Sequence, residues 1–255
     1  MLEYKQMVEF GKPYPKKILQ RLFYLQMSCG SDLNTNDALQ EMLDFLCMAR
    51  GIKPVFVAGR GIDNPCWVSG IIQLAQESGF YLEHGNFWDA YEWPEDIPTW
   101  YVKDTLALLE PFNAVYITRI KKIKNEVKEI CSRNGKITME DEARLLAYPK
   151  CCVQSHYLRL EGWYRAILSI LDRHCDGNEV LMQKLLASEK IPPPETDEEK
   201  LVFSSAYNVF PAKFGSWNMC AKCRSMKHSP SALQIKKNYN VGMLIGSKLI
   251  EMLTA

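Results

Sequence analysis

Four cysteines in two short motifs carry the clearest chemistry of this 255-residue sequence. Cys151 and Cys152 are neighbours just after Pro149, where a helix is expected to begin, and Cys220 and Cys223 form a late Cys-x-x-Cys motif. Thiolates grouped in this way are ligands that zinc and iron–sulfur clusters prefer. The two motifs therefore predict one metal site, which holds either zinc or a 4Fe–4S cluster.

Two histidines are candidates for further ligands. His156 follows Cys152 by four residues, which places both side chains on one helix face, one turn apart. Cys151 points about 100° away from Cys152 around the helix axis, so the pair suits a cluster with separate irons better than one small ion. His228 follows Cys223 by five residues. If the metal is zinc, the fourth ligand is therefore open among Cys151, His156 and His228.

Other interpretations of the same motifs stay open. A double cysteine at a helix start also fits two ordinary buried thiols, and Cys-x-x-Cys alone also fits a redox dithiol. A closed set of four ligands would make the site structural, whereas an open position would admit substrate. Enzyme activity is therefore uncertain. One hypothesis is redox or modification chemistry on a phosphate-bearing substrate or RNA, and the alternative is a non-catalytic binding module with a structural zinc site.

Composition and charge limit the compartment and the partners. The 31 basic and 30 acidic side chains give a formal net charge of +1, so the chain as a whole attracts neither nucleic acid nor an anionic membrane. No run reaches the roughly 18 apolar residues of a membrane span, and the start of the chain lacks the apolar stretch of a signal peptide. Nine cysteines suit a reducing compartment. We therefore expect a cytoplasmic protein with no membrane segment.

Two local features predict ligands besides a metal. Residues 211–250 contain seven lysines and arginines and no acidic residue, with Trp217 and Tyr239 among them. This pattern fits nucleic acid or a phosphate ligand, and it also fits a solvated helix face. Gly59 and Gly61 lie between an expected strand and an expected helix, where α/β proteins bind phosphate on backbone N–H groups. Because the third glycine of a dinucleotide fingerprint is absent, the alternative there is a tight turn.

The first half of the chain shows the elements of a small sheet. Apolar spacing predicts opening helices, and short β-branched or apolar runs predict three strands, at residues 54–58, 80–83 and 114–118. Helices expected near residues 65–78 and 99–109 separate these strands. Because parallel neighbours need a crossover that usually contains a helix, the alternation predicts an α/β fold with a small parallel sheet and crossover helices.

Strand patterns nearly vanish after residue 119, so the C-terminal half is expected to be mainly helical. A helix that begins at Pro149 has a core-facing apolar stripe, and an irregular loop is expected to hold the late Cys-x-x-Cys. These patterns predict an α/β domain with N-terminal helices over residues 1–136. They predict a helical domain with the cysteine motifs over residues 137–255, unless the two form one continuous domain.

The segment from Ala147 to Val153 reads Ala-Tyr-Pro-Lys-Cys-Cys-Val. It resembles the Gly-Tyr-Pro-x-Cys-Cys-Val signature of an uncharacterised prokaryotic family, domain of unknown function 483. The similarity extends over roughly residues 114–235 and includes the late Cys-x-x-Cys with Ser-Pro after it. The chain differs at Ala147, where glycine is usual in the family, and at Met219, where proline is usual. The resemblance implies a shared cysteine site and no particular activity.

Overall fold

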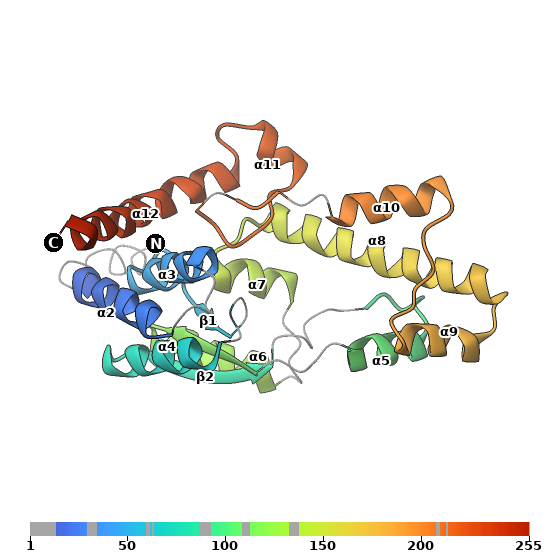
Figure 1. The fold of residues 1–255 in the computed structure, drawn as a ribbon, viewed down its shortest axis with the longest axis horizontal. Coiled ribbons are helices and arrows are strands. Elements are labelled where there is room, and N and C mark those ends of the chain that lie inside the picture. Colours follow the sequence, from blue (N-terminus) through green and yellow to red (C-terminus); the bar gives the residue numbers. More distant parts are fainter. Residues whose placement is uncertain are drawn as a thin grey trace.

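The structure, a computed structural model, describes residues 14–29, 35–59, 62, 64–86, 93–108, 113–132, 138–207, 210–212 and 214–254. Helices make up most of this part of the chain (Figure 1). They are α2 (Tyr14–Ser28), α3 (Thr35–Ala49), α4 (Pro65–Glu77), α5 (Thr99–Leu108), α6 (Lys121–Ser132), α7 (Met139–Leu146), α8 (Lys150–Cys175), α9 (Glu179–Ala187), α10 (Asp197–Tyr207), α11 (Ala221–Ser225) and α12 (Pro230–Thr254). The strands are β1 (Phe56–Ala58), β2 (Tyr81–Asn86) and β3 (Asn113–Thr118).

The three strands form one antiparallel sheet in the order β1-β3-β2. β3 lies between the other two and is antiparallel to both, so Ile117 faces Phe56 on one side and Leu82 on the other. β1 and β2 therefore run in the same direction without touching. The predicted α/β fold with a small parallel sheet is wrong: the described chain is mostly helical, and its small sheet is antiparallel.

The course of the chain after β2 explains why the parallel sheet does not form. α4 connects β1 to β2 across the sheet, as a crossover helix does. α5, the next expected crossover, leaves the sheet, and its Tyr101 is buried with Tyr164 and Leu171 of α8. A chain that leaves a sheet and returns can re-enter at either end. β3 is therefore free to run antiparallel between its neighbours.

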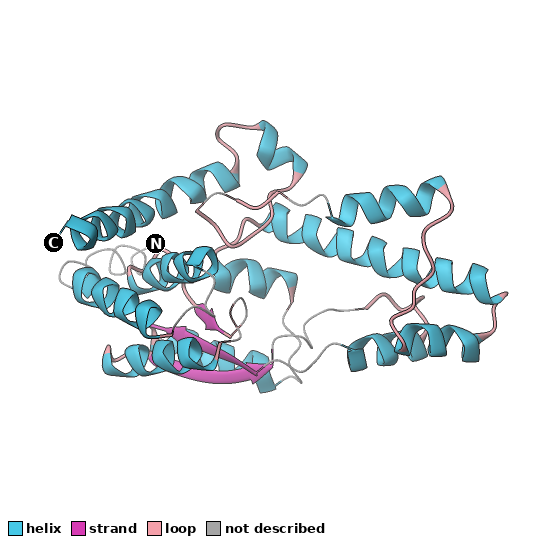
Figure 2. Ribbon diagram, viewed as in Figure 1, coloured by secondary structure: helices cyan, strands magenta, loops and turns pink. Residues whose placement is uncertain are grey.

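The sheet, with α2, α3, α4 and α12 on one face and α6 and α7 on the other, forms the part of the molecule that we call the sheet lobe (Figure 2). Successive strand residues point to opposite faces. Phe56 and Ile117 pack against α2, α3 and α4, and this cluster also contains Val241 of α12. Val57 and Tyr116 pack on the other face against α6 and α7. Both faces are therefore covered by helices.

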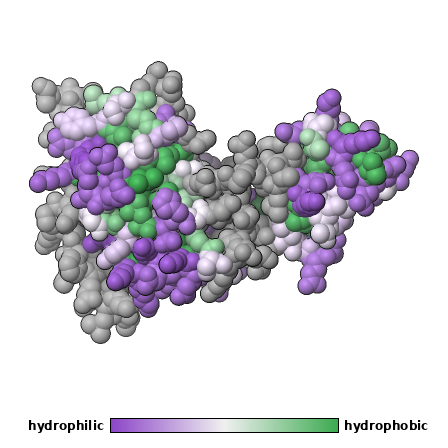
Figure 3. All heavy atoms as spheres, turned by 90° about the horizontal axis from the view of Figure 1, so that it is seen from below, coloured by the Kyte–Doolittle hydropathy of each residue, from purple (hydrophilic) through white to green (hydrophobic). Residues whose placement is uncertain are grey.

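A second cluster of helices, the helical lobe, lies beside the sheet lobe and consists of α5, α9, α10 and the C-terminal part of α8 (Figure 1). In the space-filling view, the molecule divides into a larger and a smaller part (Figure 3). α8 joins the two lobes: its 26 residues give a length of about 39 Å. Its Ile167 and Leu171 pack with Met182 of α9 and with α5. The predicted domains over 1–136 and 137–255 stay a prediction, and each lobe contains elements from both sides of that boundary.

Candidate metal centre

A sharp turn between α7 and α8 places the first two cysteines. α7 ends at Leu146, and Ala147 follows in the left-handed region with φ 54°. Pro149 then precedes the first turn of α8, and its carbonyl oxygen accepts the N–H groups of Cys152, at 2.8 Å, and Val153, at 3.1 Å. The double cysteine therefore occupies the first turn of a long helix, as predicted.

Backbone hydrogen bonds within the loop before α11 position the other two cysteines. The Ala212 N–H donates to the Trp217 carbonyl at 2.9 Å, and the Met219 N–H donates to the Phe210 carbonyl at 2.8 Å. Cys220 comes directly after this pairing and occupies the N-cap position of α11. Because α11 has only five residues, Cys223 lies within one turn of Cys220.

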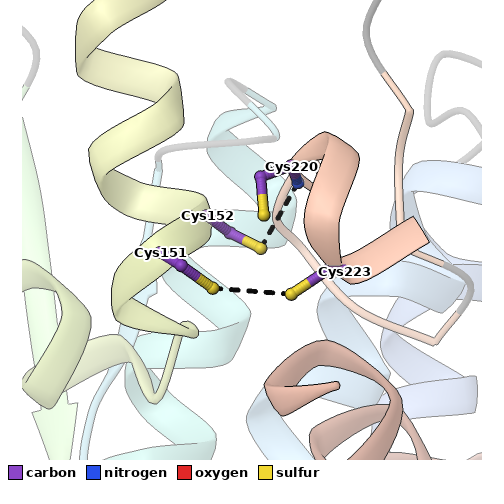
Figure 4. Close-up of side chains that lie close together, drawn as sticks. All are labelled: Cys151, Cys152, Cys220 and Cys223. Atoms are coloured by element: carbon purple, nitrogen blue, oxygen red, sulfur yellow. Dashed lines mark hydrogen bonds between the residues drawn. The ribbon is translucent and has the colours of Figure 1, made fainter. Parts of the chain in front are cut away.

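The structure brings the four cysteine side chains together (Figure 4). Their sulfur atoms all lie within 4.8 Å of one another. The sulfurs of Cys151 and Cys223 are 3.4 Å apart, and the Cys220 N–H donates to the Cys152 sulfur at 3.4 Å. Cys152, Cys220 and Cys223 are buried, and Cys151 is half-buried. Four thiols at this spacing could hold a metal ion.

Both neighbours of the double cysteine belong to the group, although helix geometry separates them. Figure 4 shows Cys151 and Cys152 pointing towards α11, with Cys223 beside the first and Cys220 beside the second. The angle between the two side chains about the axis of α8 does not keep either out of the group. α11 lies against the N-terminal end of α8, and both side chains point towards α11. His156, on α8, and His228, before α12, lie outside the group of four.

Three of these cysteines, Cys151, Cys152 and Cys223, have shifted pKa values. Burial opposes ionisation of Cys223, but hydrogen bonds from the Ser231 side chain and backbone, and from Cys151 and Cys152, lower its pKa to about 6. Burial raises the pKa of Cys151 to about 12, and the hydrogen bond to Cys223 adds to this. Burial also raises the pKa of Cys152, to about 11. The lowered pKa favours the thiolate form of Cys223, whereas the raised pKa values of Cys151 and Cys152 favour their thiol forms.

A buried serine supports the thiols from the side of α12. The Ser231 hydroxyl lies 3.1 Å from the Cys152 sulfur, and the Trp217 indole N–H donates to the Ser231 oxygen at 3.1 Å. Ser231 therefore links the Cys152 sulfur to the Trp217 indole. Ser229 caps α12 and donates to the Cys223 carbonyl at 3.0 Å. The sequence pattern did not point to Ser231, since a serine inside a helix gives no separate signal.

A cavity of about 250 Å³, lined by both apolar and charged side chains, adjoins the centre. Tyr148 and Ser216 line it, and their hydroxyls are 2.8 Å apart, while the Tyr148 ring packs on Trp217 at 5.7 Å between ring centroids. Buried Lys53 also lines the cavity, and its Nζ forms an ion pair with Asp44 at 3.1 Å. Tyr148 and Trp217 therefore separate the cavity from the thiol group.

The structure describes parts of the two other predicted ligand sites, one of which, the basic segment 211–250, contains Cys220 and Cys223. Gly59 has a φ of 82°, which glycine adopts at no steric cost and other residues rarely adopt. A tight turn that needs glycine accounts for this, while Gly61 lies outside the described residues. Within the basic segment 211–250, the exposed cationic side chains of the described residues include Lys222, Arg224, Lys227 and Lys237.

Comparisons with protein-family models, with curated proteins and with solved structures find no match to this chain. The resemblance to domain of unknown function 483 therefore stays a prediction. In the described part of the chain, no helix combines the length and the apolar character that a membrane crossing requires.

Proposed function

We propose that this chain is a zinc-binding protein in which Cys151, Cys152, Cys220 and Cys223 form a closed, structural centre. The observation that carries the proposal is the mutual distance of the four sulfurs, all within 4.8 Å. A tetrahedral zinc ion with Zn–S bonds of about 2.3 Å holds its sulfurs about 3.8 Å apart. Because the sulfur separations lie on both sides of this value, from 3.4 Å between Cys151 and Cys223 up to at most 4.8 Å, small side-chain shifts would complete the coordination.

The size of the group favours a single ion over a 4Fe–4S cluster. Each cysteine of such a cluster binds a different iron atom, so the cluster itself separates the four sulfurs. One ion binds all four at the same atom and draws them closer. The number of thiols also favours a structural role, because catalytic zinc sites keep one position for water or substrate.

The ion would hold the loop of Cys220 and Cys223 against α8. The cluster around the thiols is small: besides the cysteines, its buried members are Ala212 and Trp217. So few apolar side chains stabilise a loop weakly, and metal binding then supplies much of its folding free energy. The centre therefore fixes the segment that carries the exposed cations.

The function that we propose for this segment is binding of single-stranded nucleic acid. Lys222 and Arg224 are exposed on α11, and Arg224 stacks over the exposed ring of Phe210 at 3.7 Å from its centroid. Lys227 and Tyr239 are also exposed. Cations that contact phosphates, together with aromatic rings on which bases stack, are the two components of single-strand recognition.

Metal analysis of the purified protein tests the zinc centre. We expect one zinc per chain, no visible colour, and loss of that zinc in Cys220→Ser. Cys175→Ser is the matched control, because Cys175 is equally buried, 8% exposed like Cys220, but lies in the helical lobe. Brown protein that contains iron and absorbs near ~400 nm would indicate a cluster instead. Equal zinc content in the two variants would argue against these ligands.

Fluorescence anisotropy with a labelled single-stranded RNA tests the nucleic-acid surface. We expect the double variant Lys222→Gln, Lys227→Gln to weaken binding and to reduce the slope of log affinity against log salt by about one for each lysine that binds a phosphate. The control pair is Lys121→Gln, Lys122→Gln, two adjacent exposed lysines at the start of α6. Equal effects of the two pairs, or no binding at low salt, would contradict the proposal.

A further inference from the structure

Two cysteines outside the zinc centre lie unusually close together. Cys29 follows the end of α2, and Cys66 is the second residue of α4. Their sulfurs are 2.7 Å apart, with the Cys29 thiol donating to Cys66. Neither belongs to the four-cysteine group. The chain thus contains a second, separate thiol pair that the sequence gives no reason to expect, since the two residues are 37 positions apart.

The packing of the two helices creates this approach. Gly70 of α4 faces Leu25 of α2 so closely that a Cβ at position 70 would clash with the leucine side chain. Glycine therefore allows the helices to come together next to the thiols. Cys66 is exposed and Cys29 partly exposed, so a dissolved oxidant can reach the pair.

We propose that Cys29 and Cys66 are a modification site that forms a reversible disulfide when the protein meets a peroxide. A disulfide has its sulfurs about 2.05 Å apart, so the observed separation of 2.7 Å closes with a small movement of two side chains. In a reducing compartment such a bond is transient and is reversed by thiol exchange.

The chemistry uses hydrogen peroxide as the oxidant. The sulfur of Cys66, the more exposed thiol and one at a helix N-terminus, attacks one peroxide oxygen. The O–O bond breaks, water leaves, and Cys66 becomes a sulfenic acid. The sulfur of Cys29 then attacks the Cys66 sulfur, the S–O bond breaks, and a second water leaves with the Cys29 proton. In total two thiols lose two electrons and two protons, and one peroxide becomes two waters.

Peptide mapping of the whole chain, loaded with zinc, tests the proposal. After brief exposure to hydrogen peroxide, free thiols are alkylated and tryptic peptides are analysed by mass spectrometry without reduction. We expect the peptide with Cys66 linked to the peptide with Cys29, with fragment ions that distinguish Cys29 from Cys47, and complete reversal by dithiothreitol. The cysteines of the zinc centre lie on other tryptic peptides, so their state is read separately.

Three variants make the result decisive. Cys66→Ala removes the linkage, and because Cys66 is exposed the variant is expected to fold. Cys29→Ser leaves Cys66 as a sulfenic acid that dimedone traps, whereas Cys131→Ser, a partly buried control, keeps the linkage. Zinc content is unchanged in all three, which separates this proposal from the zinc centre. Over-oxidation of Cys66 without linkage in the wild type, or linkage of Cys66 to several cysteines equally, overturns it.

Discussion

The hydroxyl of Ser231 lies 3.1 Å from the sulfur of Cys152, 79 residues earlier in the chain. Both groups are buried, and the serine oxygen also accepts the Trp217 indole N–H at 3.1 Å. The contact connects the first turn of α12 to the first turn of α8. It joins the group of four thiols to a residue outside that group.

Replacement of this serine tests whether metal binding depends on the contact. We expect Ser231→Ala to weaken zinc binding about 10-fold, because hydrogen bonds to ligand atoms typically contribute that much to metal affinity. Competition with a chromogenic chelator measures the change. Ser225→Ala is the control, since the exposed Ser225 hydroxyl donates to the Lys222 carbonyl within α11. An unchanged affinity in Ser231→Ala would show that the hydroxyl is dispensable.

At position 147, glycine is expected to give a more stable protein than the alanine that is present. Ala147 has a φ of 54°, and a left-handed conformation costs a residue with a Cβ about 1–2 kcal/mol. Glycine also loses more entropy on folding, by about 0.4–1 kcal/mol. Ala147→Gly should therefore stabilise the protein by about 0.5–1 kcal/mol, measured by urea denaturation. Ala143→Gly, in the helical part of α7, should change stability in the opposite direction.

The buried ion pair beside the cavity should be sensitive to loss of one partner. Lys53 is 4% exposed, and its Nζ lies 3.1 Å from Asp44. Lys53→Met leaves a buried carboxylate alone, which is expected to cost about 3–5 kcal/mol. The double variant Lys53→Met, Asp44→Leu should be more stable than the single one. Denaturation curves of the three proteins measure this, and additive losses would contradict the expected coupling.

The ionisation of Lys53 should make the stability of the fold depend on pH in a particular range. Burial disfavours its ammonium, but the nearby Asp44 carboxylate, the strongest opposing influence, leaves its pKa raised above 10.5. A raised pKa in the folded state stabilises the fold fully below the unfolded pKa, and this contribution is lost as the pH rises through the folded value. Lys53 therefore adds no pH dependence near neutrality. We expect wild type to lose stability relative to the double variant only in strongly alkaline solution.

A capping box at the start of α10 should stabilise the folded protein at neutral pH and lose this effect in acid. Glu199 accepts the N–H groups of Glu195, at 2.8 Å, and Thr196, at 3.1 Å, and these bonds, ahead of its pairing with Arg173, lower its pKa. The lowered pKa means that the stabilisation is present above the unfolded value and lost as the pH falls through the folded one.

Two substitutions test this box. Thr196→Ala removes the hydroxyl that accepts the Glu199 N–H at 3.1 Å, and the loss should be about 1 kcal/mol. Glu199→Gln should reduce the acid dependence of thermal unfolding relative to wild type. Glu198→Gln, at an exposed neighbouring position, should leave that dependence unchanged.

Sequence reasoning predicted the parts of the metal centre better than its surroundings. Local patterns sufficed for the helix after Pro149 and for the loop of Cys220, because caps and breakers act within a few residues. The course of α5 depends on Tyr101 packing against Tyr164, a contact across 63 residues, and no local pattern encodes it. The antiparallel β3, the Lys53–Asp44 pair and the Cys29–Cys66 pair likewise depend on tertiary packing.

The last helix has a consequence for protein synthesis. Val241 and Ile245 of α12 complete the core cluster that contains Leu22 of α2 and Met42 of α3. A ribosome adds about 5–20 residues per second, so α2 and α3 emerge roughly 10 s or more before α12. During that interval the apolar faces of α2 and α3 lack the packing contacts that α12 later provides. We therefore expect the nascent chain to expose these apolar faces until α12 has been synthesised.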